Sequence, residues 1–451
     1  MALLVAGAFF MEIVDATIIT PAIPLIATSF GVDPVDVSVA ISAYLVTLAV
    51  LIPASGWLAD RFGPRPVFTA AIAIFTLASL GCALSGSLPM LVGMRILQGV
   101  GGAMMVPVGR LAVLRVSGKT NLVRAIALLT WPALAAPVVA PVLGGAIASL
   151  GSWRWIFLVN VPIGIVGVVL SRRLIRGEPH PDPRPLDWRG LLLLGAGIAA
   201  ALVALENVHV SATHWTLVAA GGVIALLLLA GATWHLLHTS HPLVELRVLR
   251  VPTLRITVTA GSLYRLVVTA VPFLLPLQFQ LVFGWTPFLS GLMVAVLFAG
   301  NIAVKPATTP LMRRFGIRRV LLVDGVLSVG CTCLLASLAP TMPVAAVAAI
   351  LFLSGALRSI GFTAYVSLAF SDVTGEDLTH GNTLNAAVQE LASGLGIALA
   401  ALVLTTLTPF AGAPGAAYSW TFVTLAGLMA LTTIATIRLS PDAGSSVTAK
   451  G

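Results

Sequence analysis

Two carboxylates inside the first apolar run of the chain have a spacing that could carry a proton. Glu12 and Asp15 stand three residues apart within Ala2–Phe30, so a helix would present both on one face. Burial and a neighbouring like charge both favour the protonated form of a carboxyl group. The two residues are therefore candidates for groups that take up and release protons. The alternative for each is structural, such as Asp15 bonding to neighbouring backbone groups.

Further charges fall inside later apolar runs, where an isolated charge is expensive. Arg95 lies in Leu88–Val108 and needs a partner, for which the two carboxylates of the first run are the obvious candidates. The remaining candidates for charges in a central cavity are Arg265, Lys305, Arg358 and Glu390. The last three could instead be helix-end charges that reach the membrane surface. We expect Asp324, near the start of its run, to pair with Arg318 and Arg319 at that helix end.

These residues must be positioned by membrane helices. The 451-residue chain is 58% hydrophobic and only 9% charged, a balance that excludes a soluble domain and predicts an all-α polytopic membrane protein. Fourteen apolar runs are long enough to span, in the order six, two, six. They are Ala2–Phe30, Val37–Leu58, Val67–Leu84, Leu88–Val108, Ala125–Ala148, Trp155–Leu170, Gly190–Leu205, Thr216–Leu236, Ile256–Phe283, Leu289–Leu311, Val320–Leu338, Val344–Phe370, Leu384–Leu407 and Tyr418–Ile437.

The distribution of positive charge predicts the topology. With both termini in the cytoplasm, 20 of the 25 Lys and Arg residues fall in cytoplasmic loops and helix ends, and only Arg154 falls outside. This asymmetry predicts that both termini lie in the cytoplasm. It also explains the net charge of +9 without a nucleic-acid partner. Arg outnumbers Lys 22 to 3, which favours a bacterial source, so we expect a bacterial inner-membrane protein.

Prolines and charges mark the expected domain boundaries. We predict two six-helix bundles joined by cytoplasmic linkers and an inserted two-helix hairpin. The expected segments are a bundle over 1–171, a linker over 172–189, the hairpin over 190–237, a second linker over 238–255, a second bundle over 256–439 and a tail over 440–451.

A repeat supports the division into two halves. Pro53–Phe68 and Pro306–Leu321 are identical at eight positions, at an offset of 253 residues. That offset is too long for six spans and fits six spans plus an inserted pair, and such repeats are typical of secondary transporters. It also places Arg265 at the position equivalent to Glu12. We therefore expect these two charges to approach each other near the membrane centre.

The first copy of the repeat resembles the loop signature of the major facilitator superfamily, G-x-x-x-D-R-x-G-x-R between spans 2 and 3. The matching residues are Gly56, Asp60, Arg61, Gly63 and Arg65. The resemblance implies two pseudo-symmetric bundles that rock about a central site. It also implies that the Asp and Arg lock neighbouring helix ends in one conformation and release them in the other.

Three more stretches resemble motifs of the fourteen-span drug:proton antiporters in that superfamily. Val14–Pro24 is similar to the first-span motif around Asp15, and the stretch from Arg95 through Gln98 to Ala103 is similar to the fourth-span motif. The fifth-span antiporter motif is carried by Ala136, Pro137, Ala140, Pro141, Gly144 and Gly145. Ala136 and Ala140 replace glycines of that motif. The resemblance implies a proton-coupled exporter of amphipathic or cationic drugs, with Asp15 and Arg95 in proton coupling. Glu12, which the family motif does not require, and Glu390, which the repeat offset places near the centre, are further candidates for proton coupling.

Other classes of function find less support. No hydrolase or phosphate-binding motif occurs, so we expect neither an enzyme nor a cofactor. The triplet His235, His238 and His241 could hold a metal, but no further ligand type completes a set, and we expect no metal. The expected partners are a small-molecule substrate, protons and the lipid bilayer, with the chain a monomer. The alternatives are a specific exporter of an organic acid or metal–acid chelate, which the buried cations would suit, and an intramembrane enzyme or receptor.

Overall fold

The computed structural model describes residues 1–116, 122–175, 185–206, 215–373, 377–440 and 443–444, and all regular elements within these ranges are helical. Half of the first predicted linker, residues 176–184, and most of the tail lie outside the described residues. The elements are α1 (Ala2–Ile18), η1 (Thr20–Ala22), α2 (Ile23–Phe30), α3 (Ser38–Phe62), α4 (Pro64–Ala83), α5 (Leu88–Val116), α6 (Leu122–Ser149), α7 (Trp155–Leu158), α8 (Asn160–Leu174), α9 (Trp188–Glu206), α10 (Trp215–His238), η3 (Leu246–Arg250), α11 (Pro252–Ile256), η4 (Thr257–Gly261), α12 (Ser262–Leu281), α13 (Pro287–Ala303), α14 (Lys305–Phe315), α15 (Ile317–Ala336), α16 (Val344–Ala369), α17 (Asp377–Leu407), η5 (Thr408–Phe410) and α18 (Pro414–Ile437).

Twelve helical stretches among the described residues are long and apolar enough to cross a membrane. The count is thirteen if α13 and α14, which meet at a 45° bend, form one span. The part of α6 whose side chains the structure describes includes the apolar helical segment Leu134–Ser149, which by itself is shorter than a span. The protein is therefore a multi-pass helical membrane protein, as predicted, but the expected number of fourteen spans is not confirmed.

The sequence repeat has a counterpart in the backbone. Gly63 joins α3 to α4 with φ 85° and ψ 151°, and Gly316 joins α14 to α15 with φ 80° and ψ 150°. A side chain would strain this conformation, which is why glycine stands at both positions. The two glycines are 253 residues apart, so the two halves turn in the same way at the same place.

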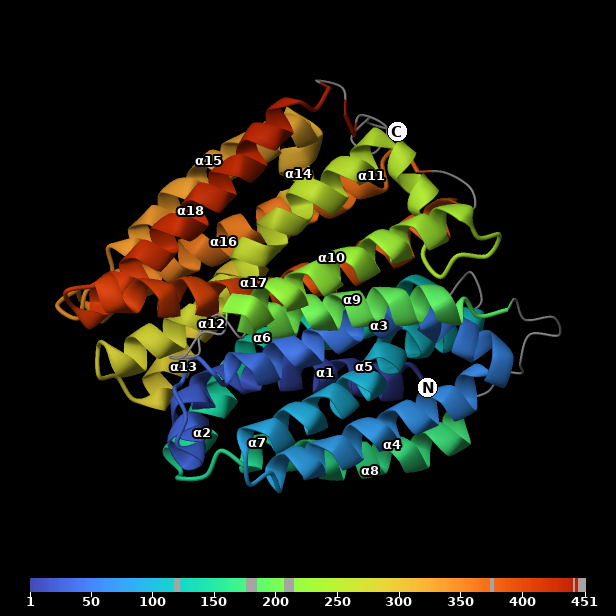
Figure 1. The fold of residues 1–451 in the computed structure, drawn as a ribbon, viewed down its shortest axis with the longest axis horizontal. Coiled ribbons are helices and arrows are strands. Elements are labelled where there is room, and N and C mark those ends of the chain that lie inside the picture. Colours follow the sequence, from blue (N-terminus) through green and yellow to red (C-terminus); the bar gives the residue numbers. More distant parts are fainter. Residues whose placement is uncertain (117–121, 176–184, 207–214, 374–376, 441–442, 445–451) are drawn as a thin grey trace.

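Two groups of helices form the body of the protein (Figure 1). The two groups contact each other mainly at two places, each formed by one helix from either group. One group contains α1, α3, α4, α5, α6 and α8, and the other contains α12, α13, α15, α16, α17 and α18. Contacts between the groups run along α3 with α17 and along α6 with α13. Span 2 of each half therefore meets span 5 of the other half.

The two ends of the body differ in how the groups meet. Figure 1 shows the chain termini toward one end and α2 and α13 at the other, which we call the distal end. At the distal end the first span breaks at η1, where Pro21 lies, and Gln280 of α12 donates a hydrogen bond to the Pro21 carbonyl at 2.9 Å. This contact joins the two groups at the distal end.

The α9–α10 pair lies where the sequence predicts an inserted hairpin. The two helices pack against each other, and α9 also contacts α3 and α17. Ile198 and Leu202 of α9 share an apolar cluster with Val46 of α3 and Ala398 of α17. The pair therefore covers one of the two seams between the helix groups. The predicted domain boundaries remain predictions.

Candidate transport site

A polar network surrounds Asp15 in the middle of the first helix group. The carboxylate forms an ion pair with Arg95 of α5. It also accepts hydrogen bonds from the side-chain amides of Gln98 at 2.8 Å and Asn160 at 2.7 Å. Neither Asp15 nor Arg95 has any exposed surface. One guanidinium and two side-chain amides from two other helices thus surround this buried carboxylate.

The guanidinium of Arg95 is itself held on several sides. It donates to the Gln98 side chain at 2.8 Å and to the Ala40 carbonyl at 3.4 Å, and it lies 4.3 Å from the centre of the Tyr44 ring. Arg95 and Gln98 stand three apart on α5, so they share a helix face. The structure therefore brings together Asp15 and Arg95, which the sequence proposed as partners.

Sequence reasoning gave no role to Asn160 and Ser79, which complete this network. Asn160 donates to both Asp15 and Ser79, and Gln98 also donates to Ser79 at 2.7 Å. A weak indication of a role for Asn160 is present in the sequence, because its side-chain amide falls within the apolar run Trp155–Leu170. A polar residue there needs a partner among the other spans.

Glu12 lies near the seam between the helix groups, without a hydrogen bond to its Oε2 atom, which is buried. Asp15 of the same helix and Glu390 of α17 both act on it electrostatically. Arg265 acts in turn on Glu390 and donates a hydrogen bond to Ser393 at 2.8 Å. Electrostatic interactions thus connect Glu12 of the first helix group, through Glu390, to Arg265 of the second helix group. Among the described residues Glu12 and Arg265 form no ion pair within 4.0 Å, so the predicted pair is not made in this conformation.

Two more buried cations of the second half bond to neutral groups. Arg358 donates to the Val268 carbonyl at 3.0 Å and lies 5.1 Å from the centre of the Phe298 ring. Lys305 begins α14, just after the bend, and donates to the Thr363 hydroxyl at 2.9 Å. Neither cation has a carboxylate within 4.0 Å among the residues that the structure describes. Both are therefore available to an anionic group.

The predicted pairing of Asp324 with Arg318 and Arg319 is wrong. Asp324 is buried within the second helix group and accepts a hydrogen bond from the Tyr264 hydroxyl at 3.3 Å. Arg318 instead donates to the Ile437 carbonyl at 3.1 Å. The physical reason is helix geometry, because Asp324 lies two turns inside α15, on its inward face, whereas Arg318 lies in the first turn.

The residues of the predicted gating loop divide between a cavity and the surface. Gly56 and Asp60 line a cavity of about 460 Å³, together with Trp57 and residues of both predicted linkers. Arg61 and Arg65 are exposed, and the buried Gly63 makes the turn described above. The cavity also reaches α17, through His380 and Thr383. This loop therefore faces both helix groups at the end that carries the termini.

Asp187, which the sequence analysis did not single out, ties three segments together beside this cavity. Burial alone would raise the pKa of its carboxyl. Hydrogen bonds from the Gly190 amide at 2.8 Å, from His235 Nε2 at 2.7 Å and from the Leu243 amide at 3.1 Å outweigh burial and lower that pKa below its usual range. The signal in the sequence was an acidic residue just before a helix, where it caps the first turn.

The three histidines considered for a metal have separate partners. His235 bonds to Asp187, whereas His238 bonds through Nδ1 to the Trp234 carbonyl at 2.7 Å. His241 lies beyond the helix end and lines the 460 Å³ cavity. Their spacing of three reflects the end of α10 rather than a common ligand direction.

The antiporter motif lies where α6 passes between α1 and α13. Ala136 and Ala140 are fully buried, and Pro137 and Pro141 lie inside the helix. A Cβ atom on Gly144 would overlap the Ile18 carbonyl, and one on Gly145 would overlap the Pro287 carbonyl. Gly291 of α13 approaches the Pro141 carbonyl equally closely. The motif therefore allows backbone contact on both sides of α6.

Comparisons with known proteins agree with this architecture. The family model of the Major Facilitator Superfamily matches residues 5–397 and 257–450. Proteins with the provisional name multidrug resistance protein MdtD are among the relatives. The Salmonella typhimurium protein is 37% identical over 404 residues, covering 89% of this chain and 85% of the relative. The Serratia proteamaculans protein is 34% identical over 454 residues, covering 97% and 93%.

Solved structures share the fold at low sequence identity. A D-xylose–proton symporter has a TM-score of 0.70 at 14% identity, over 99% of this chain and 98% of the symporter. An auto-inhibited peptide transporter of the POT family has a TM-score of 0.71 at 16% identity, over 97% of each chain. The sequence matches confirm the predicted superfamily and indicate a membrane transporter rather than an enzyme. This chain belongs to the major facilitator superfamily.

Proposed function

We propose that this transporter is a proton-coupled exporter of amphipathic or cationic drugs, working by alternating access in a bacterial inner membrane with both termini in the cytoplasm. The observation that carries the proposal is the buried Asp15–Arg95 pair at the position of the antiporter first-span motif. The names of its relatives support the class of substrate. With this orientation the distal end is the outer side, where the two helix groups touch through Gln280 and Pro21.

The network suggests how a proton would act. Protonation of Asp15 removes the charge that Arg95 faces, and a buried guanidinium cannot release a proton to compensate. Losing one partner of a buried pair costs about 3–5 kcal/mol, which is enough to favour a conformation that hydrates Arg95 or gives it another partner. Glu12 and Glu390 lie across the seam from each other and would receive a cationic substrate or a second proton.

The second candidate function is export of a specific anion, such as an organic acid or a metal–acid chelate. Arg265, Lys305 and Arg358 favour it, because their bonding partners are hydroxyl and carbonyl groups and no carboxylate lies within 4.0 Å among the described residues. The two candidates differ in the sign of the substrate charge, so they predict different sensitivities to mutation.

Transport by purified protein in liposomes separates them. With an imposed pH gradient, we expect movement of lipophilic cations that stops when a protonophore collapses the gradient. Glu12→Gln with Glu390→Gln should then reduce cation transport more than Arg265→Gln with Arg358→Gln. The reverse order, with transport of organic acids or their metal chelates, would support the anion exporter. Transport that is unaffected by the protonophore would refute proton coupling.

A further inference from the structure

The second helix group contains a buried carboxyl group that the central site does not use. Asp324 of α15 is 3% exposed, and its Oδ1 atom has no hydrogen-bond partner. No Lys, Arg or His nitrogen lies within 4.0 Å of it among the described residues. Asp15 shows the contrast, since it has a guanidinium and two amides around it. A buried carboxylate without a cation or several donors is strongly disfavoured relative to the neutral acid.

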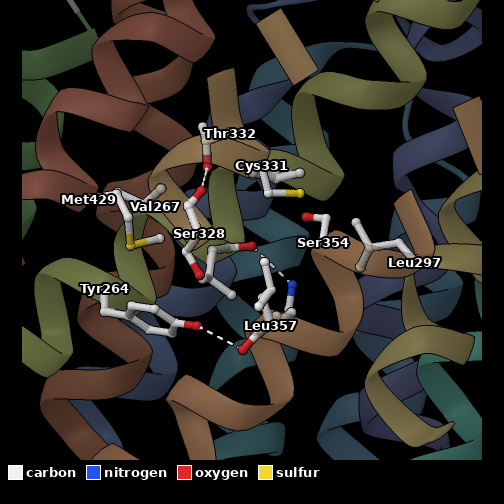
Figure 2. Close-up of a pocket in the computed structure, with 12 residues that line it drawn as sticks. Tyr264, Val267, Leu297, Ser328, Cys331, Thr332, Ser354, Leu357 and Met429 are labelled. Carbon is white, nitrogen blue, oxygen red and sulfur yellow. Dashed lines mark hydrogen bonds between the residues drawn. The ribbon is translucent and has the colours of Figure 1, made fainter. Parts of the chain in front are cut away.

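The hydrogen bonds of Tyr264 indicate where the proton of that acid would sit. The Tyr264 hydroxyl lies 3.3 Å from Asp324 Oδ2. It also lies 3.2 Å from the Leu357 carbonyl oxygen, a contact drawn in Figure 2. A phenol has one hydrogen, and an ionised Asp324 and the carbonyl would compete for it. If Asp324 carries a proton, its own O–H donates to the phenol oxygen while the phenol donates to Leu357. Protonation of Asp324 therefore gives the acid, the phenol and the carbonyl each a hydrogen-bond partner.

The charged and titratable groups around Asp324 do not supply another counter-charge. Tyr264 faces it from α12, and Tyr365 acts on it from α16. Arg358, also on α16, acts electrostatically on Tyr264 rather than forming a pair with the carboxyl. From α18 the nearby polar groups are threonine hydroxyls, of which Thr436 bonds to Tyr365 at 3.1 Å. Ser328, one turn along α15, adds only a neutral hydroxyl.

A small cavity lies beside Tyr264 and Arg358. Its volume is about 20 Å³, and its lining includes Tyr264, Ser328, Ser354 and Arg358 (Figure 2). This is room for one water molecule, which needs roughly 10–15 Å³ and two to four polar partners. Arg358 on the cavity wall interacts electrostatically with Arg265, which acts in turn on Glu390. Polar groups therefore continue from Asp324 to the seam between the helix groups.

We propose that Asp324 is a second proton-binding site of the transporter, occupied in this conformation and connected to the central charges through Tyr264 and the small cavity. In the transfer step, the Asp324 hydroxyl hydrogen moves to the phenol oxygen of Tyr264. The phenol hydrogen first turns from the Leu357 carbonyl toward a water molecule in the cavity and then moves to that water as the Asp324 hydrogen arrives, which leaves Asp324 ionised and the water as hydronium. The return of a proton along the same path restores the acid. This proposal rests on the proposed proton coupling.

Infrared spectroscopy of the purified protein tests occupancy without relying on transport. We expect a C=O stretching band of a protonated carboxylic acid at neutral pH that disappears in Asp324→Asn. Asp33→Asn, in an exposed distal loop, should leave that band unchanged and serves as the matched control. Asparagine preserves the shape and neutrality of the acid, so the variant should fold and bind substrate as the wild type does. A spectrum in which Asp324→Asn removes no protonated-acid band would overturn the proposal.

Proton counting tests whether the bound proton moves. The number of protons exchanged per substrate in liposomes should fall in Asp324→Asn, and the pH profile of transport should lose one titration step. Tyr264→Phe should keep the infrared band but slow proton exchange, because it removes the relay hydroxyl and keeps the ring. An unchanged proton count in Asp324→Asn would overturn the role in coupling. If the wild type moves no protons while the band persists, the proposed function fails and proton binding at Asp324 stands.

Discussion

The Asp15–Arg95 pair predicts an asymmetry between two single substitutions that remove the same contact. Both residues are fully buried, so either change leaves a charge without its main partner. Asp15→Asn leaves a guanidinium that cannot become neutral, and we expect it to destabilise the fold by about 3–5 kcal/mol. This corresponds to a reduction of roughly 150-fold to 5,000-fold in the ratio of folded to unfolded protein.

Arg95→Met should destabilise less. The Asp15 carboxylate would keep hydrogen bonds from Gln98 at 2.8 Å and Asn160 at 2.7 Å, and it can bind a proton if the site becomes too costly for a charge. The double variant Asp15→Asn with Arg95→Met removes both charges and should be more stable than Asp15→Asn alone. Its recovery relative to additivity should fall within about 0.5–3 kcal/mol, the range for residues in contact.

Denaturant unfolding in detergent, followed by helical circular dichroism, measures all four proteins of this cycle. The order of stability expected is wild type, then Arg95→Met and the double variant, with Asp15→Asn lowest. Proton-driven efflux should be lost in each variant that lacks Asp15. Strictly additive losses, or Arg95→Met as the least stable variant, would refute the argument that an uncompensated guanidinium is the costly species.

Three further predictions concern the seam, the gating loop and the linker contact. Gly291→Ala places a Cβ atom against the Pro141 carbonyl, so it should impair transport in liposomes with little loss of expression. The control Gly93→Ala, whose Cβ atom meets nothing within 4 Å, should leave transport unchanged. Equal effects of the two substitutions would contradict the backbone contact. Asp60→Asn and Arg61→Ala should lower the maximal transport rate more than the substrate affinity, because the loop lies apart from the Asp15 network. A loss confined to substrate affinity would argue against a gating role. Asp187 has a lowered pKa, so its contacts are fully present above the usual Asp pKa and are lost as the pH falls through the lowered value. Asp187→Asn should mimic that loss at neutral pH and speed amide hydrogen exchange around Leu243. Unchanged exchange in this variant would contradict the prediction.

The pairing of Asp15 with Arg95 could be predicted because the membrane leaves few choices. A charge inside an apolar run must find an opposite charge, and the first half offers few. The same rule failed for Asp324, because sequence distance to Arg318 and Arg319 says nothing about which face of α15 a residue occupies. Helix phase and neighbouring helices decided that Asp324 meets Tyr264, which is 60 residues earlier.

Other features depended on contacts that a repeat offset cannot resolve. The turns at Gly63 and Gly316 match across the offset of 253 residues, because both glycines belong to the repeated segment itself. The offset did not predict that Glu390 and Ser393 of α17 would come between Glu12 and Arg265. The role of Asp187 was likewise inaccessible, since its bonds join residues 48 and 56 positions away along the chain.

The glycine contacts between α6 and α13 have a consequence for the energetics of motion. Where Gly145 meets Pro287 and Gly291 meets Pro141, the touching surfaces are main chain, with no rotamers to reorder as one helix slides on the other. We therefore expect a low barrier to sliding at this contact, because no side chain has to change its rotamer. The energy difference between conformations is then concentrated in the hydration of charged groups. We therefore expect the conformational balance to respond more to ionisation than to the bulk of lipid-facing side chains.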